Sequence, residues 1–156
     1  MTTRKPFTRA ALVAAALLPL LLAGCGLHHR QHQGGARMAD PANPRVLVDD
    51  KGRLSVNQEP LRYYKAQGAV TITWRLPADG RYSFPKDGIV IERLSANGGS
   101  AGVETDEFRC APGAKPNEFS CLNRNSRGAE YKYTVRALQD GKPLPALDPR
   151  IINDFD

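Results

Sequence analysis

Two stretches of the chain alternate strictly between apolar and polar residues, and this alternation restricts the fold more than any other feature. Residues 70–76 have apolar side chains at every second position, and residues 131–137 repeat the pattern. A period of two places the apolar side chains on one face of a β-strand, whereas an amphipathic helix needs a period near 3.6. No window of 11 or more residues after position 44 holds a helical period. The folded part is therefore predicted to be all-β. The apolar positions are Val70, Ile72, Trp74, Leu76, Tyr131, Tyr133, Val135 and Ala137.

Further short runs have strand character and are separated by turns rich in Gly, Pro, Asn and Asp. About seven such strands at this spacing indicate a β-sandwich over residues 45–156. Residues 46–48 and 54–56 flank the turn DDKG and predict a β-hairpin. At the C-terminal end, Asp148-Pro149 predicts a turn and Ile151-Ile152 a final strand at a sheet edge. An exposed apolar tail for a partner is the alternative for this last segment.

The pattern resembles the immunoglobulin and fibronectin type III sandwiches over roughly residues 70–138. Trp74 lies in an early strand, an Ile-rich strand follows, and the late segment EYKYTVRAL comes after a Gly turn. The resemblance implies a single antiparallel immunoglobulin-like β-sandwich in which Tyr131 or Tyr133 holds the tyrosine-corner position, with its hydroxyl bonded to the chain upstream. Segments such as FPKDGIVIE are also similar to a class of small exported bacterial proteins without an assigned activity, which implies fold and location only.

A basic segment, an apolar run and a cysteine follow one another at the N-terminus. Three basic residues precede the apolar run from Ala10 to Leu22. This run of 13 residues has the length of a signal-peptide core and is shorter than the roughly 20 residues of a membrane-spanning helix. The tetrapeptide Leu22-Ala23-Gly24-Cys25 matches the lipobox of bacterial lipoproteins. Residues 1–24 are therefore predicted to be a lipoprotein signal peptide, with an ordinary secretory signal or an uncleaved short anchor as alternatives.

The resemblance to lipoproteins implies a covalent lipid on Cys25 and no other cofactor. Three hydrocarbon chains on this residue exceed the two anchoring signals that stable membrane attachment needs. Gly26 stands where the family's sorting rule places Asp in proteins kept in the inner membrane, so the resemblance implies the outer membrane, facing the periplasm. Residues 25–44 are poor in apolar side chains and predict a flexible tether behind the lipidated cysteine.

All three histidines of the chain, His28, His29 and His32, lie in the predicted tether. Neutral imidazoles at this spacing suit a divalent transition metal. The alternative is that they belong to a solvated linker, in which no surrounding groups orient the ligands.

The remaining cysteines, Cys110 and Cys121, are predicted to form a disulfide, since an exported protein folds in an oxidising compartment. Each follows a phenylalanine two residues earlier, Phe108 and Phe119. Residues two apart share one face of a strand, so both pairs are expected to point inward. Ten residues separate the cysteines, which is unlike the CxxC of redox-active pairs.

Charge and histidine content argue against several function classes. The net charge is +6, but three of the basic residues precede Cys25, and residues 45–156 hold 17 Lys and Arg against 15 Asp and Glu. Nucleic-acid binding is therefore not expected. Residues 45–156 contain no histidine. This excludes a blue-copper site in the body, and it excludes a His-dependent hydrolase unless the tether delivers the base. Glu104, Asp106 and Glu107 are expected to be solvated charges or a divalent-cation contact on an exposed loop, rather than an acid–base pair.

Two surface groups are candidates for a partner surface. Tyr63 and Tyr64 lie beside basic residues, a mixture suited to stacking on a glycan or a partner, although adjacent strand residues face opposite sides and one tyrosine is expected inside. Arg124 and Arg127 suit an anionic group, or simply form part of a turn. The sequence thus predicts no enzyme but a membrane-anchored binding or structural module of the cell envelope, with a cell-wall or envelope-protein partner. The alternative is a divalent-metal or small-ligand handling protein using the tether histidines and the acidic loop.

Overall fold

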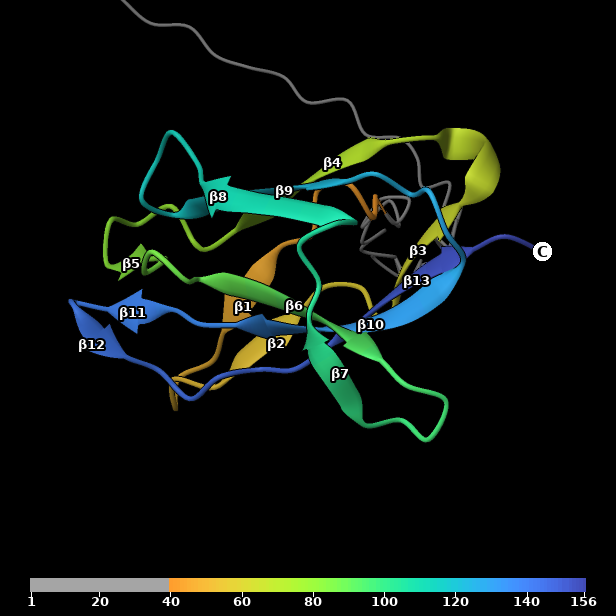
Figure 1. Ribbon diagram of the computed structural model, residues 1–156. Coiled ribbons are helices and arrows are strands. Elements are labelled where there is room, and N and C mark those ends of the chain that lie inside the picture. The colour runs from red at the N-terminus through yellow and green to blue at the C-terminus, as the bar shows by residue number, and fades with distance from the viewer. Residues whose placement is uncertain (1–39) are drawn as a thin grey trace, which may run out of the picture. The chain divides into compact units, whose positions relative to one another are not determined.

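The computed structural model describes residues 40–156, which form two β-sheets packed face to face with short additional strands (Figure 1). The predicted signal peptide, Cys25 and the three histidines lie outside the described residues. The strands are β1 (Val46–Val48), β2 (Leu54–Val56), β3 (Leu61–Tyr64), β4 (Val70–Arg75), β5 (Tyr82–Ser83), β6 (Ile89–Leu94), β7 (Ser100–Val103), β8 (Phe108–Pro112), β9 (Glu118–Asn123), β10 (Ala129–Val135), β11 (Leu138–Gln139), β12 (Lys142–Pro143) and β13 (Arg150–Asp154). A 3-10 helix, η1 (Lys65–Gln67), follows β3.

The larger sheet has the strand order β3-β13-β10-β6-β7, and the smaller sheet has the order β4-β9-β8. β1 and β2 form the predicted hairpin, and β5, β11 and β12 form a small accessory sheet. The order β4-β9-β8 follows strands B, E and D of an immunoglobulin sandwich, and β6, β10 and β13 follow strands C, F and G. The predicted all-β sandwich is thus confirmed.

The topology differs from the prediction in two respects. β3 pairs in parallel with β13, so the sheets are not purely antiparallel. The predicted final strand, β13, lies between β10 and β3 and not at a sheet edge. Both differences have one cause, because β3 adds to the larger sheet outside β13 instead of pairing with β4.

The core includes seven of the eight side chains that the alternation assigned to it, and the eighth, Val70, is half-buried against it. Ile72 and Trp74 from β4 are fully buried, as are Tyr131, Tyr133 and Val135 from β10. The Trp74 and Tyr133 rings lie 5.3 Å apart between centroids, across the two sheets. Phe108 of β8 packs edge-on against Tyr131 at 4.8 Å. Aromatic residues bury about 150–250 Å² each, so these contacts dominate the packing between the sheets.

Residues 40–44, which the sequence analysis assigned to the tether, are hydrogen-bonded to the domain. The backbone N–H of Thr73 donates to the carbonyl of Ala42 at 2.8 Å, and that of Arg75 donates to the carbonyl of Pro44 at 3.2 Å. The segment therefore covers the free edge of β4, which would otherwise expose unpaired backbone groups. Both sheets, the core and the cysteine pair lie within residues 40–156.

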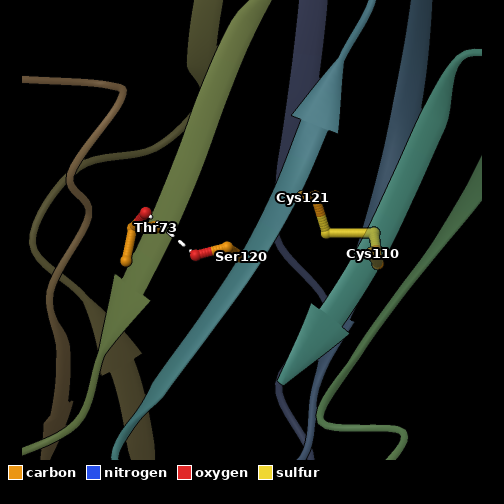
Figure 2. Close-up of a disulfide and its surroundings, with 4 residues drawn as sticks. All are labelled: Thr73, Cys110, Ser120 and Cys121. Carbon is orange, nitrogen blue, oxygen red and sulfur yellow. Dashed lines mark hydrogen bonds between the residues drawn. A yellow bond between two sulfur atoms is a disulfide. The ribbon is translucent and has the colours of Figure 1, made fainter. Parts of the chain in front are cut away.

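Cys110 of β8 and Cys121 of β9 lie directly opposite each other, and their sulfur atoms are at bonding distance, 2.09 Å apart (Figure 2). This agrees with the predicted pairing. As direct cross-strand partners, both cysteines lie on the inward face of the sheet as expected, but only Cys121 is buried and Cys110 is exposed. The reason is that β8 is the outermost strand of the smaller sheet. The bond joins neighbouring strands of one sheet and does not link the two sheets.

The tyrosine-corner assignment is wrong for both candidates. The hydroxyls of Tyr131 and Tyr133 have no hydrogen-bond partner among the described residues, because both side chains point into the core from the middle of β10. A different tyrosine makes a bond of this kind. The hydroxyl of the fully buried Tyr63 donates to the carbonyl of Pro41, 22 residues upstream, and so ties β3 to the segment that covers β4.

The two buried tyrosine environments give a matched test by urea denaturation of the chain from Gly26 onward. We expect Tyr63→Phe to lower the free energy of unfolding by about 1 kcal/mol, since it removes a hydrogen bond and leaves the Pro41 carbonyl without a partner. Tyr131→Phe removes a hydroxyl that bonds to nothing, and we expect a smaller loss or a gain. Equal losses in the two variants would contradict this assignment of the hydroxyls.

Candidate functional site

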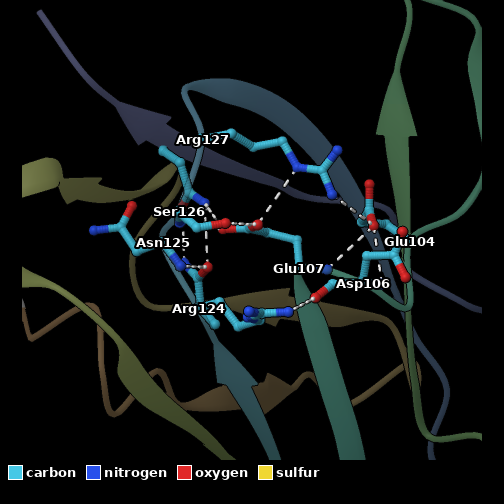
Figure 3. A network of polar contacts seen from close by, with 9 residues as sticks. Glu104, Asp106, Glu107, Arg124, Asn125, Ser126 and Arg127 are labelled. Carbon is cyan, nitrogen blue, oxygen red and sulfur yellow. Dashed lines mark hydrogen bonds and ion pairs between the residues drawn. The ribbon is translucent and has the colours of Figure 1, made fainter.

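A group of polar side chains lies at the end of the sandwich where β8 begins and β9 ends, and it includes the acidic loop. Glu107 immediately precedes β8 and is only 1% exposed. Side chains from the segment after β9 and from β13 surround it (Figure 3). We call this group the Glu107 cluster, and its members are Glu104, Glu107, Asn123, Ser126, Arg127 and Asn153.

The carboxylate of Glu107 accepts four hydrogen bonds. Ser126 donates its backbone N–H at 2.5 Å and its hydroxyl at 2.7 Å. Arg127 Nε donates at 3.4 Å, and Asn153 Nδ2 donates at 3.4 Å. A buried ionised carboxylate is tolerated when donors satisfy its oxygens and an opposite charge lies near. The expectation of a solvated charge on an exposed loop is therefore wrong for Glu107.

Arg127 lies between two carboxylates, as Figure 3 shows. Its guanidinium is 3.4 Å from Glu107 and 3.5 Å from Glu104. Glu104 also accepts the backbone N–H groups of Asp106 and Glu107 and so orders the loop before β8. Arg124 and Arg127 therefore do not form an open anion-binding site, because Arg127 already forms ion pairs within the domain.

The electrostatics of the cluster favour a charged Glu107. Burial alone would raise the pKa of this carboxyl, but hydrogen bonds from Ser126 and Arg127 and the charge of Arg127 outweigh burial and hold the pKa below its usual value. A general acid at neutral pH needs a raised pKa instead. Nearby, burial is the main cause that raises the pKa of Tyr131 to about 12, so its hydroxyl stays protonated. The arrangement is a structural ion pair.

Two asparagines complete the cluster and connect the sheets. Asn123 of β9 donates to Asn153 of β13 at 2.7 Å, and Asn153 donates back at 3.1 Å. Both are buried in the inward register of their strands, where apolar side chains are the rule. Sequence reasoning missed them, although their spacing from Cys121 and Ile151 places both on the inward faces. Asn125 continues the polar group by donating to the carbonyls of Tyr64 and Gly68.

Tyr63 and Tyr64 face opposite sides of β3, as expected for adjacent strand residues. Tyr63 is fully buried, and Tyr64 is 53% exposed. The basic residues beside them are engaged within the domain. Arg62 pairs with Asp154 at 2.5 Å, and the Lys65 ammonium lies 5.3 Å from the centre of the Phe155 ring. Tyr64 is therefore the exposed member of the predicted basic and aromatic group.

Two depressions of about 430 and 420 Å³ lie around the start of β10 and share Glu130. The first also contains Arg150, which pairs with Glu130 at 3.2 Å. Small-molecule sites are mainly apolar with a few polar groups, whereas the surface of both depressions is mainly polar. Within residues 40–156, no three side chains of His, Cys, Asp or Glu gather in a way that suits a metal ion.

Two comparisons, with protein-family models and with curated proteins, found no relative of this chain. No family model matches the chain, and no curated protein matches it. Among residues 40–156 there is no helix with the length and apolar character needed to cross a membrane.

The lowered pKa of Glu107 predicts how stability depends on pH. Because the folded-state pKa lies below the unfolded value of about 4.3, the ion pair stabilises the fold above that value, and the contribution is lost as pH falls through the folded-state pKa. We expect Glu107→Gln to lower the free energy of unfolding at pH 7 by about 2 kcal/mol and to weaken its dependence on acid pH.

The control is Glu130→Gln, which removes an exposed carboxylate of the Arg150 pair and should change stability by less than about 1 kcal/mol. Urea denaturation of both variants across the acid range is the measurement. An unchanged acid profile in Glu107→Gln would contradict the assignment of the buried charge.

Proposed function

We propose that this chain is a lipid-anchored protein of the bacterial cell envelope, in which a β-sandwich module is held at the membrane through Cys25. The module acts by binding or structural contact and carries no catalytic site. The lipobox Leu22-Ala23-Gly24-Cys25, at the end of a basic and apolar N-terminal segment, is the observation on which this proposal rests.

The cysteine pair supports the proposal in two ways. Cys110 and Cys121 are at bonding distance from each other, and Cys25 is the third cysteine of the sequence, outside that pair. Disulfides persist in oxidising compartments such as the periplasm and are rare in the cytosol. An exported protein with one lipidated cysteine accounts for all three residues. Gly26 in place of Asp favours the outer membrane, with the module facing the periplasm.

The side-chain chemistry of the described residues supports binding over catalysis. The one buried carboxylate pairs with Arg127, and its lowered pKa does not suit acid catalysis. The acidic loop that a divalent cation would need is engaged in the same ion pairs. No observation in residues 40–156 favours the metal-handling alternative, so we propose contact with an envelope or cell-wall partner.

Replacement of Cys25 tests the anchor directly. We expect Cys25→Ser, expressed from the full chain with a labelled fatty acid, to lose the lipid label and either to leave the membrane fraction or to accumulate as an uncut precursor. The matched control is Cys110→Ser, which also removes one thiol and should keep the label. A lipid-labelled product of unchanged mobility from Cys25→Ser would refute the proposal.

A further inference from the structure

The outer faces of the two sheets differ in how their charges are balanced. The strands of the larger sheet hold seven charged residues, and six of them form ion pairs with one another. These pairs are Arg62 with Asp154, Lys132 with Glu92, and Arg150 with Glu130. Arg93 is the exception. The outer face of the larger sheet is therefore close to neutral over its whole width.

The smaller sheet presents basic residues without such compensation. Its outer face, here called the small-sheet face, has short or uncharged side chains in the middle, the paired Arg75 and Glu118 at one end, and Arg109 and Arg124 at the other. Within the three strands, Glu118 is the one acidic residue, and it pairs with Arg75 at 3.3 Å. Arg109 and Arg124 are exposed and have no carboxylate partner among residues 40–156. The other members of the face are Thr71, Thr73, Ala111, Ser120 and Leu122.

The register places the two arginines on neighbouring positions of this face. Arg109 of β8 lies directly opposite Leu122 of β9. Arg124 is the first residue after β9, and it is exposed like Leu122, whereas Asn123 between them is buried. Arg124 Nη1 donates a hydrogen bond to the carbonyl of Asp106 at 3.3 Å. This bond holds the guanidinium near the start of β8. Leu122 is 38% exposed between them. The central hydroxyls, Thr73 and Ser120, bond to each other across β4 and β9 at 3.0 Å (Figure 2).

The N-terminal end of the described residues lies beside this sheet. Ala42 and Pro44 are hydrogen-bonded along the free edge of β4, as described above. Fourteen residues lie between Cys25 and Asp40, and a chain of that length would reach on the order of 20 Å if it were flexible throughout. An anchor on Cys25 would therefore keep the domain near the membrane surface, where either outer face is within reach of the headgroups.

We propose that the small-sheet face lies against the membrane, with Arg109 and Arg124 contacting the phosphates of anionic lipids. A guanidinium matches phosphate geometry and is more weakly hydrated than an ammonium group, so it suits contact at a headgroup layer. The balanced face of the larger sheet then points away from the membrane and stays open to partners. This inference rests on the lipid anchor of the proposed function for its biological setting, but the face itself is testable without the anchor.

The test uses the unlipidated chain from Gly26 onward and sedimentation with vesicles. One set of vesicles is phosphatidylcholine alone, and the other contains phosphatidylglycerol in equal parts. We expect binding to the anionic vesicles only, with a steep loss as salt rises, because exposed charges are screened. Each basic residue at an anionic surface raises the partition coefficient about fivefold. The double variant Arg109→Ala with Arg124→Ala should therefore lower the coefficient roughly 30-fold.

The matched control is Arg62→Ala with Arg150→Ala, which removes the same amount of positive charge from the larger sheet. Its partition coefficient should stay within about twofold of that of the unsubstituted chain. Circular dichroism shows that each variant is folded. No binding of the folded chain to anionic vesicles, or an equal loss in both double variants, would overturn the proposal and would favour an acidic protein or polymer as the occupant. Since the vesicle test omits Cys25, its failure leaves the lipid-labelling result untouched, and loss of the label does not alter the vesicle result.

Discussion

The contact between Trp74 and Tyr133 joins the two sheets through a pair of fully buried aromatic rings. The rings lie 5.3 Å apart, and the pair of Phe108 and Tyr131 repeats this inter-sheet packing nearby. Such pairs contribute about 0.5–1.5 kcal/mol each beyond the burial of their area. No disulfide in residues 40–156 joins the sheets, since the cysteine pair lies within the smaller one. Packing of buried side chains, these aromatic pairs included, therefore holds the two sheets together.

Polar contacts at the periphery of the domain also connect the two sheets. At one end, the paired amides of Asn123 and Asn153 connect β9 to β13, with the charged Glu107 beside them. Along one side, the Tyr63 hydroxyl bonds to Pro41, so the segment that covers β4 is also held to β3. These contacts satisfy buried polar groups and specify one arrangement of the sheets. The charged side chains on the outer faces of the two sheets then determine which molecules the domain binds.

The alternation of apolar residues predicted the core because each strand has one buried and one wet face. The hairpin and the cysteine pair also followed from local patterns. The burial of Glu107 and Asn153 was not predictable in this way, since polar side chains in an inward register depend on partners distant in sequence. The parallel pairing of β3 with β13 is likewise non-local. The exposure of Cys110 follows from the edge position of β8, which the sequence near the cysteine does not encode.

The three cysteines are proposed to divide into one lipid anchor, Cys25, and one disulfide pair. Peptide mass spectrometry of the protein isolated from membranes and digested without reduction tests it most directly. We expect one peptide in which Cys110 is bonded to Cys121, and an N-terminal peptide that begins at Cys25 and carries the mass of the lipid. A disulfide between Cys25 and either of the other cysteines, or an unmodified Cys25 thiol, would contradict the account.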